Sequence, residues 1–255
     1  MARSKRNLVL SVLLVVILGV FSFAVPLPYT LVIPGDTADT LGTDNGVPVI
    51  QIEGATPQPT DGKLLLVTIR ATDPDEKLYL SDLFDAWFDD DEAVVPKKSV
   101  YAEGKSKKEI IADNTKDMVE SQDHAAIAAL NHLGLDPNQV KVKLNLADVG
   151  GPSAGLMFSL GIVDQLGTQN LTGGRIIAGT GTIDDAGKVG PIGGVELKTK
   201  AAKRDGAVAF LLPKQECDKA KEVAPGGLRL IPVETLNGAV DALIAFQTGG
   251  KVPSC

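Results

Sequence analysis

A serine set among small residues is the first group in this sequence whose type and position could support chemistry. Ser153 lies in the run Gly-Gly-Pro-Ser-Ala-Gly at residues 150–155, which joins a strand-like segment to a helix-like segment. Small residues allow the backbone to turn sharply and a substrate to come close. At a helix N-terminus, free N–H groups and the helix dipole would stabilise the oxyanion of an attacked carbonyl. The position is suitable for a nucleophile, but taken alone this run favours the alternative, an ordinary helix start with a serine beside a Gly-Pro turn.

A nucleophilic serine needs a base, and the sequence offers two kinds. The chain has only two histidines, His124 and His132, which share one expected helix and show no spacing typical of a catalytic triad. The run around Ser153 also differs from the G-x-S-x-G elbow of the α/β-hydrolases. We therefore interpret the histidines as helix-surface residues and consider a Ser-Lys pair instead.

Lys198 is the lysine best placed to serve as that base. On a helical projection of residues 194–205, with about 100° per residue, it falls inside the arc formed by the apolar side chains. That arc consists of Val195, Leu197, Ala201 and Ala202, whereas Lys200, Lys203 and Arg204 fall on the polar side. Burial lowers the pKa of an amine and so favours the neutral form that a general base requires. A lysine that snorkels from the edge of the apolar face is the structural alternative.

These residues must be positioned by a mixture of helices and strands. Apolar residues at steps of three and four predict helices over residues 80–88, 114–133, 153–166, 194–205, 216–223 and 234–246. Alternating segments predict strands over residues 49–53, 64–69, 140–146, 176–183, 208–212 and 228–233, with the first two paired to each other. A turn is expected at residues 184–187. The class is therefore α/β or α+β.

The sequence resembles the proteolytic domain of Lon, a family of Ser-Lys peptidases, in three blocks that follow the family's order. The blocks are Gly-Pro-Ser-Ala-Gly at 151–155, Thr-Gly-Thr-Ile at 180–183 with Gly-Lys-Val-Gly-Pro-Ile-Gly-Gly at 187–194, and Lys198 with Ala-Ala-Lys-Arg at 201–204. The segment Asp-Met-Val-Glu-Ser-Gln at 117–122 also resembles an earlier helix of the family, and the similarity covers residues 47–246. It implies an α+β fold of the ribosomal protein S5 domain 2-like type, with a mixed sheet and packed helices.

The resemblance also assigns roles to individual residues. It implies that Ser153 is the nucleophile, Lys198 the general base and Thr180 the residue that holds the neutral amine in place. Backbone N–H groups around Gly151, Pro152 and Ser153 would form the oxyanion hole. The reaction implied is peptide hydrolysis through an acyl-enzyme, without a cofactor or a metal.

The N-terminus predicts a membrane anchor. Residues 8–25 carry no charge and would span about 27 Å as a helix, close to the thickness of a bilayer core. Arg3, Lys5 and Arg6 precede this run, so the positive-inside rule leaves residues 1–7 in the cytoplasm and the remainder outside it. A cleaved signal peptide is the alternative, because Ser-Phe-Ala at 22–24 resembles a cleavage site. Beyond the anchor we expect a linker at 26–46, a proteolytic domain at 47–247 and a tail at 248–255.

Composition disfavours several other classes. The net charge of −7 argues against nucleic acid as a partner. The acidic run at residues 89–92 lacks the glycine and the spacing of a calcium loop, so a solvated loop is favoured. Cys217 and Cys255 are too few for a disulfide framework, and Cys255 ends a tail expected to be loose, so we expect unpaired thiols rather than a bridge.

The organisation resembles the bacterial membrane-anchored Lon-like proteases, which lack the ATPase and usually carry a PDZ domain. No G-x-x-x-x-G-K-[ST] motif occurs, and about ten residues separate Leu135 from Asn145, too few for a further domain. We expect an ATP-independent serine endopeptidase at the outer face of the cell membrane. Its substrates would be unfolded or membrane-proximal protein segments, and the family's rings imply a homo-oligomer.

An inactive scaffold is the alternative function. Such a protein would be anchored in the membrane and keep the fold without cleaving peptides. Gly150 favours it, because many Lon domains carry an acidic residue at this position, three before the serine. The missing PDZ domain favours it as well. The persistence of Ser153, Thr180 and Lys198 in their expected places argues against it.

Overall fold

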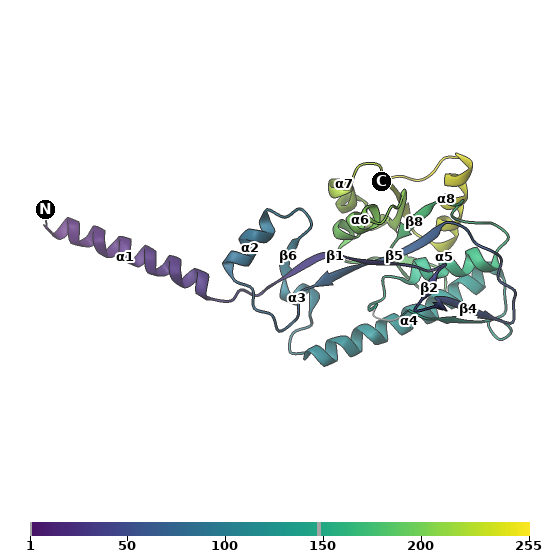
Figure 1. Cartoon of the computed structure of the whole chain (residues 1–255), viewed down its shortest axis with the longest axis horizontal. Helices are drawn as coiled ribbons and strands as arrows, with labels where there is room; N and C mark the ends of the chain where they lie inside the picture. The colour runs from purple at the N-terminus through teal and green to yellow at the C-terminus, as the bar shows by residue number, and fades with distance from the viewer. Residues whose placement is uncertain (1, 147–148) are drawn as a thin grey trace. The chain divides into compact units, whose positions relative to one another are not determined.

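The computed structural model describes residues 2–146 and 149–255 and mixes helices with strands throughout (Figure 1). Met1, which begins the expected cytoplasmic segment, and residues 147–148, inside the expected proteolytic domain, lie outside the described residues. Two compact units are present, one bounded as Met1–Ile33 with Ala71–Lys107 and the other as Pro34–Arg70 with Lys108–Cys255. The expected α+β class is confirmed.

The elements lie close to the segments that the sequence periodicity predicts. The helices are α1 (Ala2–Ala24), α2 (Leu80–Trp87), α3 (Lys97–Val100), α4 (Lys107–Leu133), α5 (Gly155–Leu166), α6 (Val195–Arg204), the 3-10 turn η1 (Lys214–Glu216), α7 (Cys217–Val223) and α8 (Leu236–Thr248). The strands are β1 (Tyr29–Asp39), β2 (Thr43–Asp44), β3 (Val47–Pro48), β4 (Ile50–Glu53), β5 (Lys63–Ala71), β6 (Ala93–Pro96), β7 (Lys141–Leu144), β8 (Ile176–Gly179), β9 (Thr182–Ile183), β10 (Val189–Gly190), β11 (Ala209–Pro213) and β12 (Arg229–Val233).

The larger unit is organised by a sheet in the order β12, β11, β8, β5, β1. β5, β8, β11 and β12 run parallel to one another, and β5 pairs with β8 from Lys63↔Ile176 to Leu66↔Gly179. Parallel strands covered on both faces read as continuous apolar runs, which explains residues 64–67 and 209–212. Both faces of this part of the sheet are therefore covered by other elements of the unit.

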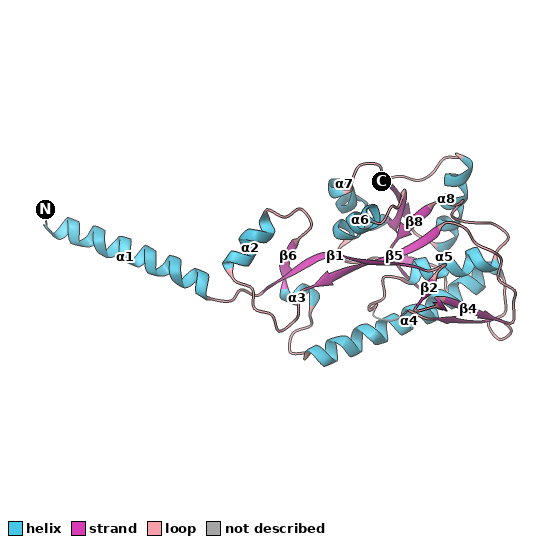
Figure 2. Ribbon diagram, in the orientation of Figure 1, coloured by secondary structure: helices cyan, strands magenta, loops and turns pink. Residues whose placement is uncertain are grey.

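Alternate side chains of these strands belong to two separate cores. Leu64 and Leu66 of β5 pack in a cluster with α4, α5 and α8, while Leu65 and Val67 pack in a second cluster with α6 and α7. This division follows from the two-residue period of a strand. Figure 2 shows α4 and α5 on one side of β5 and α6 and α7 on the other.

α5 is the central helix of the larger core. Every residue from Gly155 to Asp164 is buried. Glycines permit this close packing, because a Cβ at Gly155 would lie 2.9 Å from Ile183 Cγ2 and one at Gly161 would lie 2.7 Å from Ile50 Cδ1. The helix that follows the Ser153 turn is thus fixed on all sides.

The expected pairing of the first two strands is wrong. β4 pairs antiparallel with β7, from Ile50↔Leu144 to Glu53↔Lys141, and β5 lies between β8 and β1. Alternating hydrophobicity specifies which face of a strand is buried, but it does not specify the neighbouring strand.

The segment at 26–46, expected as a linker, contains an ordered strand. β1 extends over eleven residues of it. Pro34 and Gly35 both lie within this strand. A Cβ at Gly35 would lie 2.3 Å from Thr68 Oγ1, so glycine is what allows this strand to approach β5.

The smaller unit contains the apolar helix and residues that follow β5. Lys5–Ala24 of α1 is long and apolar enough to span a membrane, with a mean hydropathy of 2.6 and none of it buried. The start of β1 pairs antiparallel with β6, from Tyr29↔Pro96 to Val32↔Ala93. The short helix expected at 80–88 is present as α2, whereas β6 and α3 were not predicted.

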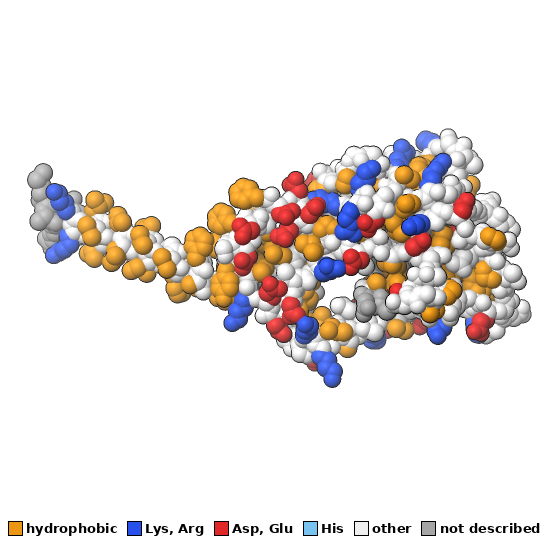
Figure 3. Space-filling view, viewed as in Figure 1, with side chains coloured by type: hydrophobic (Ala, Val, Ile, Leu, Met, Phe, Trp, Pro, Cys, Tyr) orange, Lys and Arg blue, Asp and Glu red, His pale blue; other side chains and the backbone are white. Residues whose placement is uncertain are grey.

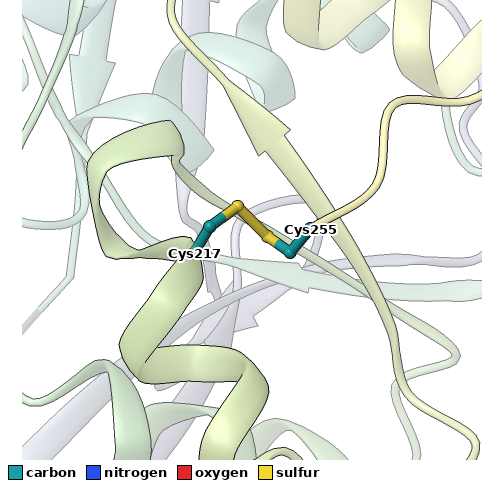
Figure 4. Close-up of a disulfide and its surroundings, with 2 residues drawn as sticks. All are labelled: Cys217 and Cys255. Atoms are coloured by element: carbon teal, nitrogen blue, oxygen red, sulfur yellow. A yellow bond between two sulfur atoms is a disulfide. The ribbon is translucent and has the colours of Figure 1, made fainter.

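The two cysteines form a disulfide, contrary to the expectation of unpaired thiols. Cys217, at the start of α7, is bonded to Cys255 (Figure 4). The C-terminal tail is held by the fold, because Arg229 Nη2 donates to the backbone oxygen of Val252 at 3.2 Å and Cys255 packs against the α6–α7 core. The prediction failed because the packing of this tail involves long-range contacts.

Candidate active site

The turn that carries Ser153 precedes α5. The helix begins at Gly155 with Ala154 as its N-cap, so Ser153 lies two residues before the helix rather than within its first turn as expected. The backbone reaches this position through Gly151, whose φ of 84° lies in the left-handed region that favours glycine.

Hydrogen bonds hold this turn to neighbouring elements on two sides. The Gly151 N–H donates to the backbone oxygen of Asn114 on α4 at 2.9 Å. Ser121 Oγ, also on α4, donates to the backbone oxygen of Pro152 at 2.9 Å. The Gly181 N–H donates to the backbone oxygen of Ser153 at 2.9 Å. The position of the serine is therefore set by α4 on one side and by the loop after β8 on the other.

Lys198 enters the site from α6. The side chain is only 2% exposed, as its place in the apolar arc predicts. Gly194 begins the helix in the left-handed conformation, with φ of 68°. Burial disfavours the ammonium ion and lowers the pKa of Lys198 to about 7. A substantial fraction of this amine is neutral near neutral pH.

Ser153, Thr180 and Lys198 meet in one hydrogen-bonded group. Lys198 Nζ lies 2.8 Å from Ser153 Oγ and 2.9 Å from Thr180 Oγ1. Thr180 is fully buried, and its hydroxyl donates to the backbone oxygen of Ser153 at 3.1 Å. Since that hydroxyl has a single proton, it accepts a hydrogen bond from the amine. The lone pair of a neutral Lys198 is then free to accept the hydroxyl proton of Ser153.

A cleft of about 460 Å³ opens beside this group. Its walls include Ser153, Lys198, Thr182, residues 66–69 of β5 and residues 191–193. A second cavity of about 420 Å³ shares Leu66, Thr68, Ile69, Val149 and Gly150 with the first. The two cavities therefore adjoin one another beside β5.

Of the three residues expected to form an oxyanion hole, Pro152 and Ser153 line the described cleft and Gly151 does not. Gly151 directs its N–H to Asn114 and does not line the described cleft, whereas Pro152, which has no N–H, does. Among the described residues, the backbone N–H of Ser153 has no hydrogen-bond partner. The backbone N–H of Ser153 is thus a donor of this turn that is available to a bound carbonyl.

Asn114 and Ser121 contribute to the site and were not predicted. Ser121 is buried and follows Met118 by three residues on the apolar face of α4. A polar residue on an apolar helix face is the signal that could have identified it, because buried hydroxyls require partners. Asn114 acts through its backbone oxygen, for which the sequence carries no signal.

The two histidines lie outside the described cleft. His124 Nδ1 lies 2.7 Å from Asp185 Oδ1 in the turn at 184–187, and this contact raises the pKa of His124. His132 Nδ1 lies 2.6 Å from Asn237 Oδ1 at the start of α8. Both therefore attach α4 to neighbouring segments.

The acidic side chains give no metal centre in the described part of the chain. Within residues 2–146 and 149–255, no three His, Cys, Asp or Glu side chains are arranged to hold a metal ion. In the acidic run, Asp89 Oδ1 accepts a hydrogen bond from the Asp91 N–H at 2.8 Å, as in a local turn.

Comparison with known proteins identifies the family. Residues 110–245 match the Lon protease (S16) C-terminal proteolytic domain. The chain is 28% identical to Lon protease 2 of Bacillus subtilis over 160 residues, covering 60% of this chain and 28% of that protein. It is 33% identical to Lon protease 3 of Sorangium cellulosum over 165 residues, covering 59% and 20%. With Lon protease 2 of Herpetosiphon aurantiacus it shares 29% over 188 residues, covering 69% and 23%.

In each of these relatives, the region that matches this chain is a minor part of the whole protein. The chain spans between 20% and 28% of the length of the three Lon proteases. The family match begins in α4 and ends in α8, so it includes every element that carries Ser153, Thr180 and Lys198. The chain therefore belongs to the Lon protease family, through its C-terminal proteolytic domain.

Proposed function

We propose that this chain is a membrane-anchored, ATP-independent serine endopeptidase with a catalytic dyad of Ser153 and Lys198. One observation carries the proposal. The amine of Lys198 is buried, has a pKa of about 7 and lies 2.8 Å from Ser153 Oγ. A general base must be within hydrogen-bond reach of the proton that it removes and substantially neutral at the working pH. Lon proteases are serine peptidases, which agrees with this chemistry.

The reaction proceeds in two stages. Lys198 Nζ takes the hydroxyl proton of Ser153 while Oγ bonds to the substrate carbonyl carbon, and the N–H of Ser153 donates to the resulting oxyanion. The Lys198 ammonium ion then transfers its proton to the departing amine as the C–N bond breaks, which leaves an ester on Ser153. A water molecule, deprotonated by the same amine, hydrolyses that ester and regenerates the serine.

The cleft beside β5 is suited to extended peptides. β5 pairs with β8 only up to Leu66, and residues 67–69, beyond that pairing, line the cleft beside Ser153. A peptide in strand conformation can satisfy its backbone groups against such a segment. Unfolded segments, loops and membrane-proximal tails are therefore the proposed substrates.

The proposed location is the outer face of the cell membrane, with α1 as a single anchor. Lys5 and Arg6 precede the apolar run, which supports an N-terminus in the cytoplasm. The disulfide of Cys217 and Cys255 supports the same location, because such bonds persist in oxidising compartments. The division into residues 1–7, 8–25, 26–46, 47–247 and 248–255 remains a proposal, in which β1 joins the segment at 26–46 to the sheet. A homo-oligomer is the proposed assembly.

A non-cleaving scaffold is the second candidate. The observation favouring it is the hydrogen bond from the Gly151 N–H to Asn114, which withholds one expected oxyanion donor. Gly150, which replaces an acidic residue of many Lon domains, favours it as well.

Proteolysis of a fluorogenic casein by the full chain in lipid vesicles separates the two candidates. Ser153→Ala and Lys198→Ala are each expected to reduce kcat by about 10³-fold or more. Ser81→Ala on α2 and Lys203→Ala on α6 serve as matched controls and should keep wild-type rates. Unchanged rates in either dyad variant would overturn the mechanism. A folded wild-type protein that never cleaves casein would support the scaffold.

A further inference from the structure

α2 exposes an aromatic stripe to solvent. Phe84, Trp87 and Phe88 are 54%, 82% and 82% exposed, and outside α1 they are the most exposed aromatic side chains of the described residues. They fall within an arc of about 100° on a helical projection. Leu83 and Ala86 lie on the inward side of the same helix, where Ala86 is buried. The stripe is therefore additional to the face that packs α2 against its own unit.

Exposed aromatic residues at such density require a partner. Three large rings at one helix end carry several hundred Å² of apolar surface in total, of which most is open to water. A patch of this kind on an otherwise polar surface marks an interaction site. Figure 3 shows hydrophobic side chains on α1 and, adjoining them, on the α2 segment.

The position of α2 within the smaller unit indicates which partner. The Leu27 N–H donates to the backbone oxygen of Leu78 at 2.7 Å, which attaches the start of α2 to the chain just after α1. Residue pairs from α1 and α2 have Cα atoms within 8 Å of one another. Figure 1 shows α2 beside the C-terminal end of α1. If α1 crosses the bilayer, α2 is at the level where the chain leaves it.

The dimensions of a bilayer agree with this placement. The headgroup region on each side is about 5–8 Å thick, and a helix of eight residues is about 12 Å long. Trp side chains are enriched at this depth, since the ring is apolar and the indole N–H can remain hydrated.

The charges near the stripe indicate which lipid surface fits. Asp82 and Asp85 lie on the opposite side of α2, and residues 89–92 (Asp-Asp-Asp-Glu) follow the helix directly. Carboxylates close to a membrane surface repel anionic lipid headgroups. A zwitterionic surface accepts the aromatic rings while the acidic residues stay in water.

We propose that Phe84 and Trp87 of α2, with its C-cap Phe88, insert into the headgroup region of a zwitterionic membrane surface and hold the smaller unit against it. This inference rests on the membrane anchoring in the proposed function. α1 then fixes the chain to the membrane, and α2 adds a second attachment that restricts how the chain can tilt.

The single tryptophan makes the proposal directly measurable. Trp87 is the only tryptophan of the chain, so its fluorescence reports this position alone. The full chain is reconstituted into phosphatidylcholine vesicles and floated through a density gradient after an alkaline wash. Emission from Trp87 should be shifted to shorter wavelength, and lipids brominated near the headgroup should quench it several-fold more than aqueous acrylamide does. Replacing half of the lipid with phosphatidylglycerol should weaken both effects.

Two variants test the stripe itself. Phe84→Ser with Phe88→Ser should return Trp87 emission toward its value in water while the chain still floats. Ile111→Ser with Val119→Ser, at exposed apolar positions on α4, is the matched control and should leave the emission unchanged.

The outcomes separate this inference from the anchor. A chain that does not float overturns both. A chain that floats with Trp87 fully open to acrylamide overturns only the surface contact. Shifted emission without quenching by brominated lipid also overturns it, since the stripe would then contact protein, such as a second copy of the chain.

Discussion

Thr180 Oγ1 donates a hydrogen bond to the backbone oxygen of Ser153 at 3.1 Å, and the same hydroxyl lies 2.9 Å from Lys198 Nζ. One buried side chain therefore contacts both the backbone of the proposed nucleophile and the proposed base. The amine has a second partner besides the serine, so its lone pair has a defined direction. The positioning of the base depends on a residue that takes no proton itself.

Thr180→Val should slow the enzyme without unfolding it. Valine keeps the shape of threonine but cannot accept a hydrogen bond from Lys198, so the amine loses its orientation. We expect kcat to fall by about 10- to 100-fold, the cost of one hydrogen bond in a buried site. Steady-state kinetics on a fluorogenic peptide would measure this. Thr180→Ser, which restores the hydroxyl, should recover much of the rate, and a Val variant as active as wild type would contradict the assigned role.

Proteolysis should depend on pH through Lys198. Its pKa is lowered to about 7 by burial, and only the neutral amine can remove the proton of Ser153. The value of kcat/KM should therefore be low at pH 5, rise through pH 7 and reach a plateau above about pH 8. Initial rates with a substrate that does not titrate in this range provide the test. A flat profile between pH 6 and 8 would be incompatible with Lys198 as the base.

Reduction of the disulfide should lower stability while sparing the chemistry. Cys217 and Cys255 close a loop with a sequence separation of 38, and a cross-link of this length contributes up to about 4 kcal/mol by limiting the unfolded chain. Dithiothreitol should lower Tm by several degrees, with casein cleavage at 25 °C unchanged. The double variant Cys217→Ser, Cys255→Ser should have the lower Tm already and not respond to dithiothreitol. If the wild type had equal Tm values with and without reductant, the disulfide would not stabilise the fold.

Asp164 should make stability fall as pH rises. This α5 residue is 3% exposed, Oδ1 accepts from the Leu171 N–H, and Oδ2 has no hydrogen-bond partner among the described residues. Burial raises its pKa from 3.8 to about 6. The stabilising contribution of the protonated form is complete below pH 3.8 and is lost as pH rises through about 6.

Asp164→Asn removes this titration and should make the free energy of unfolding depend less on pH. Between pH 5 and pH 8 the free energy of unfolding of the wild type should fall by about 1 kcal/mol relative to the variant. Taking the difference between the proteins cancels other titrating groups, Lys198 included. Chemical denaturation at the two pH values measures it, and parallel profiles would rule out the carboxyl group as their source.

Local periodicity predicted much of the fold because it depends on neighbouring residues. The helices α4, α5, α6 and α8 lie where apolar spacing predicts them, and Lys198 is buried as its projection indicates. Contacts between residues far apart in the sequence could not be predicted in this way. The partner of β4, the packing of the tail that brings Cys255 to Cys217, and the strand through Pro34 and Gly35 all depend on surfaces that only the folded chain creates.

The candidate site shows the same division. The resemblance to the Lon proteolytic domain implied that Ser153, Thr180 and Lys198 belong together, and they lie within hydrogen-bond distance of one another. The position of Ser153 before α5, and the hydrogen bond from Gly151 to Asn114, were not predicted. Helix ends are set by a few backbone hydrogen bonds, which sequence patterns define only to within a residue or two.

The close packing of α5 has a consequence for how this protein can evolve. A Cβ at Gly155 or Gly161 would stand within 2.9 Å or 2.7 Å of a side chain from another element, so enlargement there displaces the helix, and the Ser153 turn moves with it. In a saturation library scored for both abundance and proteolysis, variants at these two glycines would lose proteolysis while still accumulating. Selection for proteolysis would therefore also limit which residues can occupy these core positions of α5.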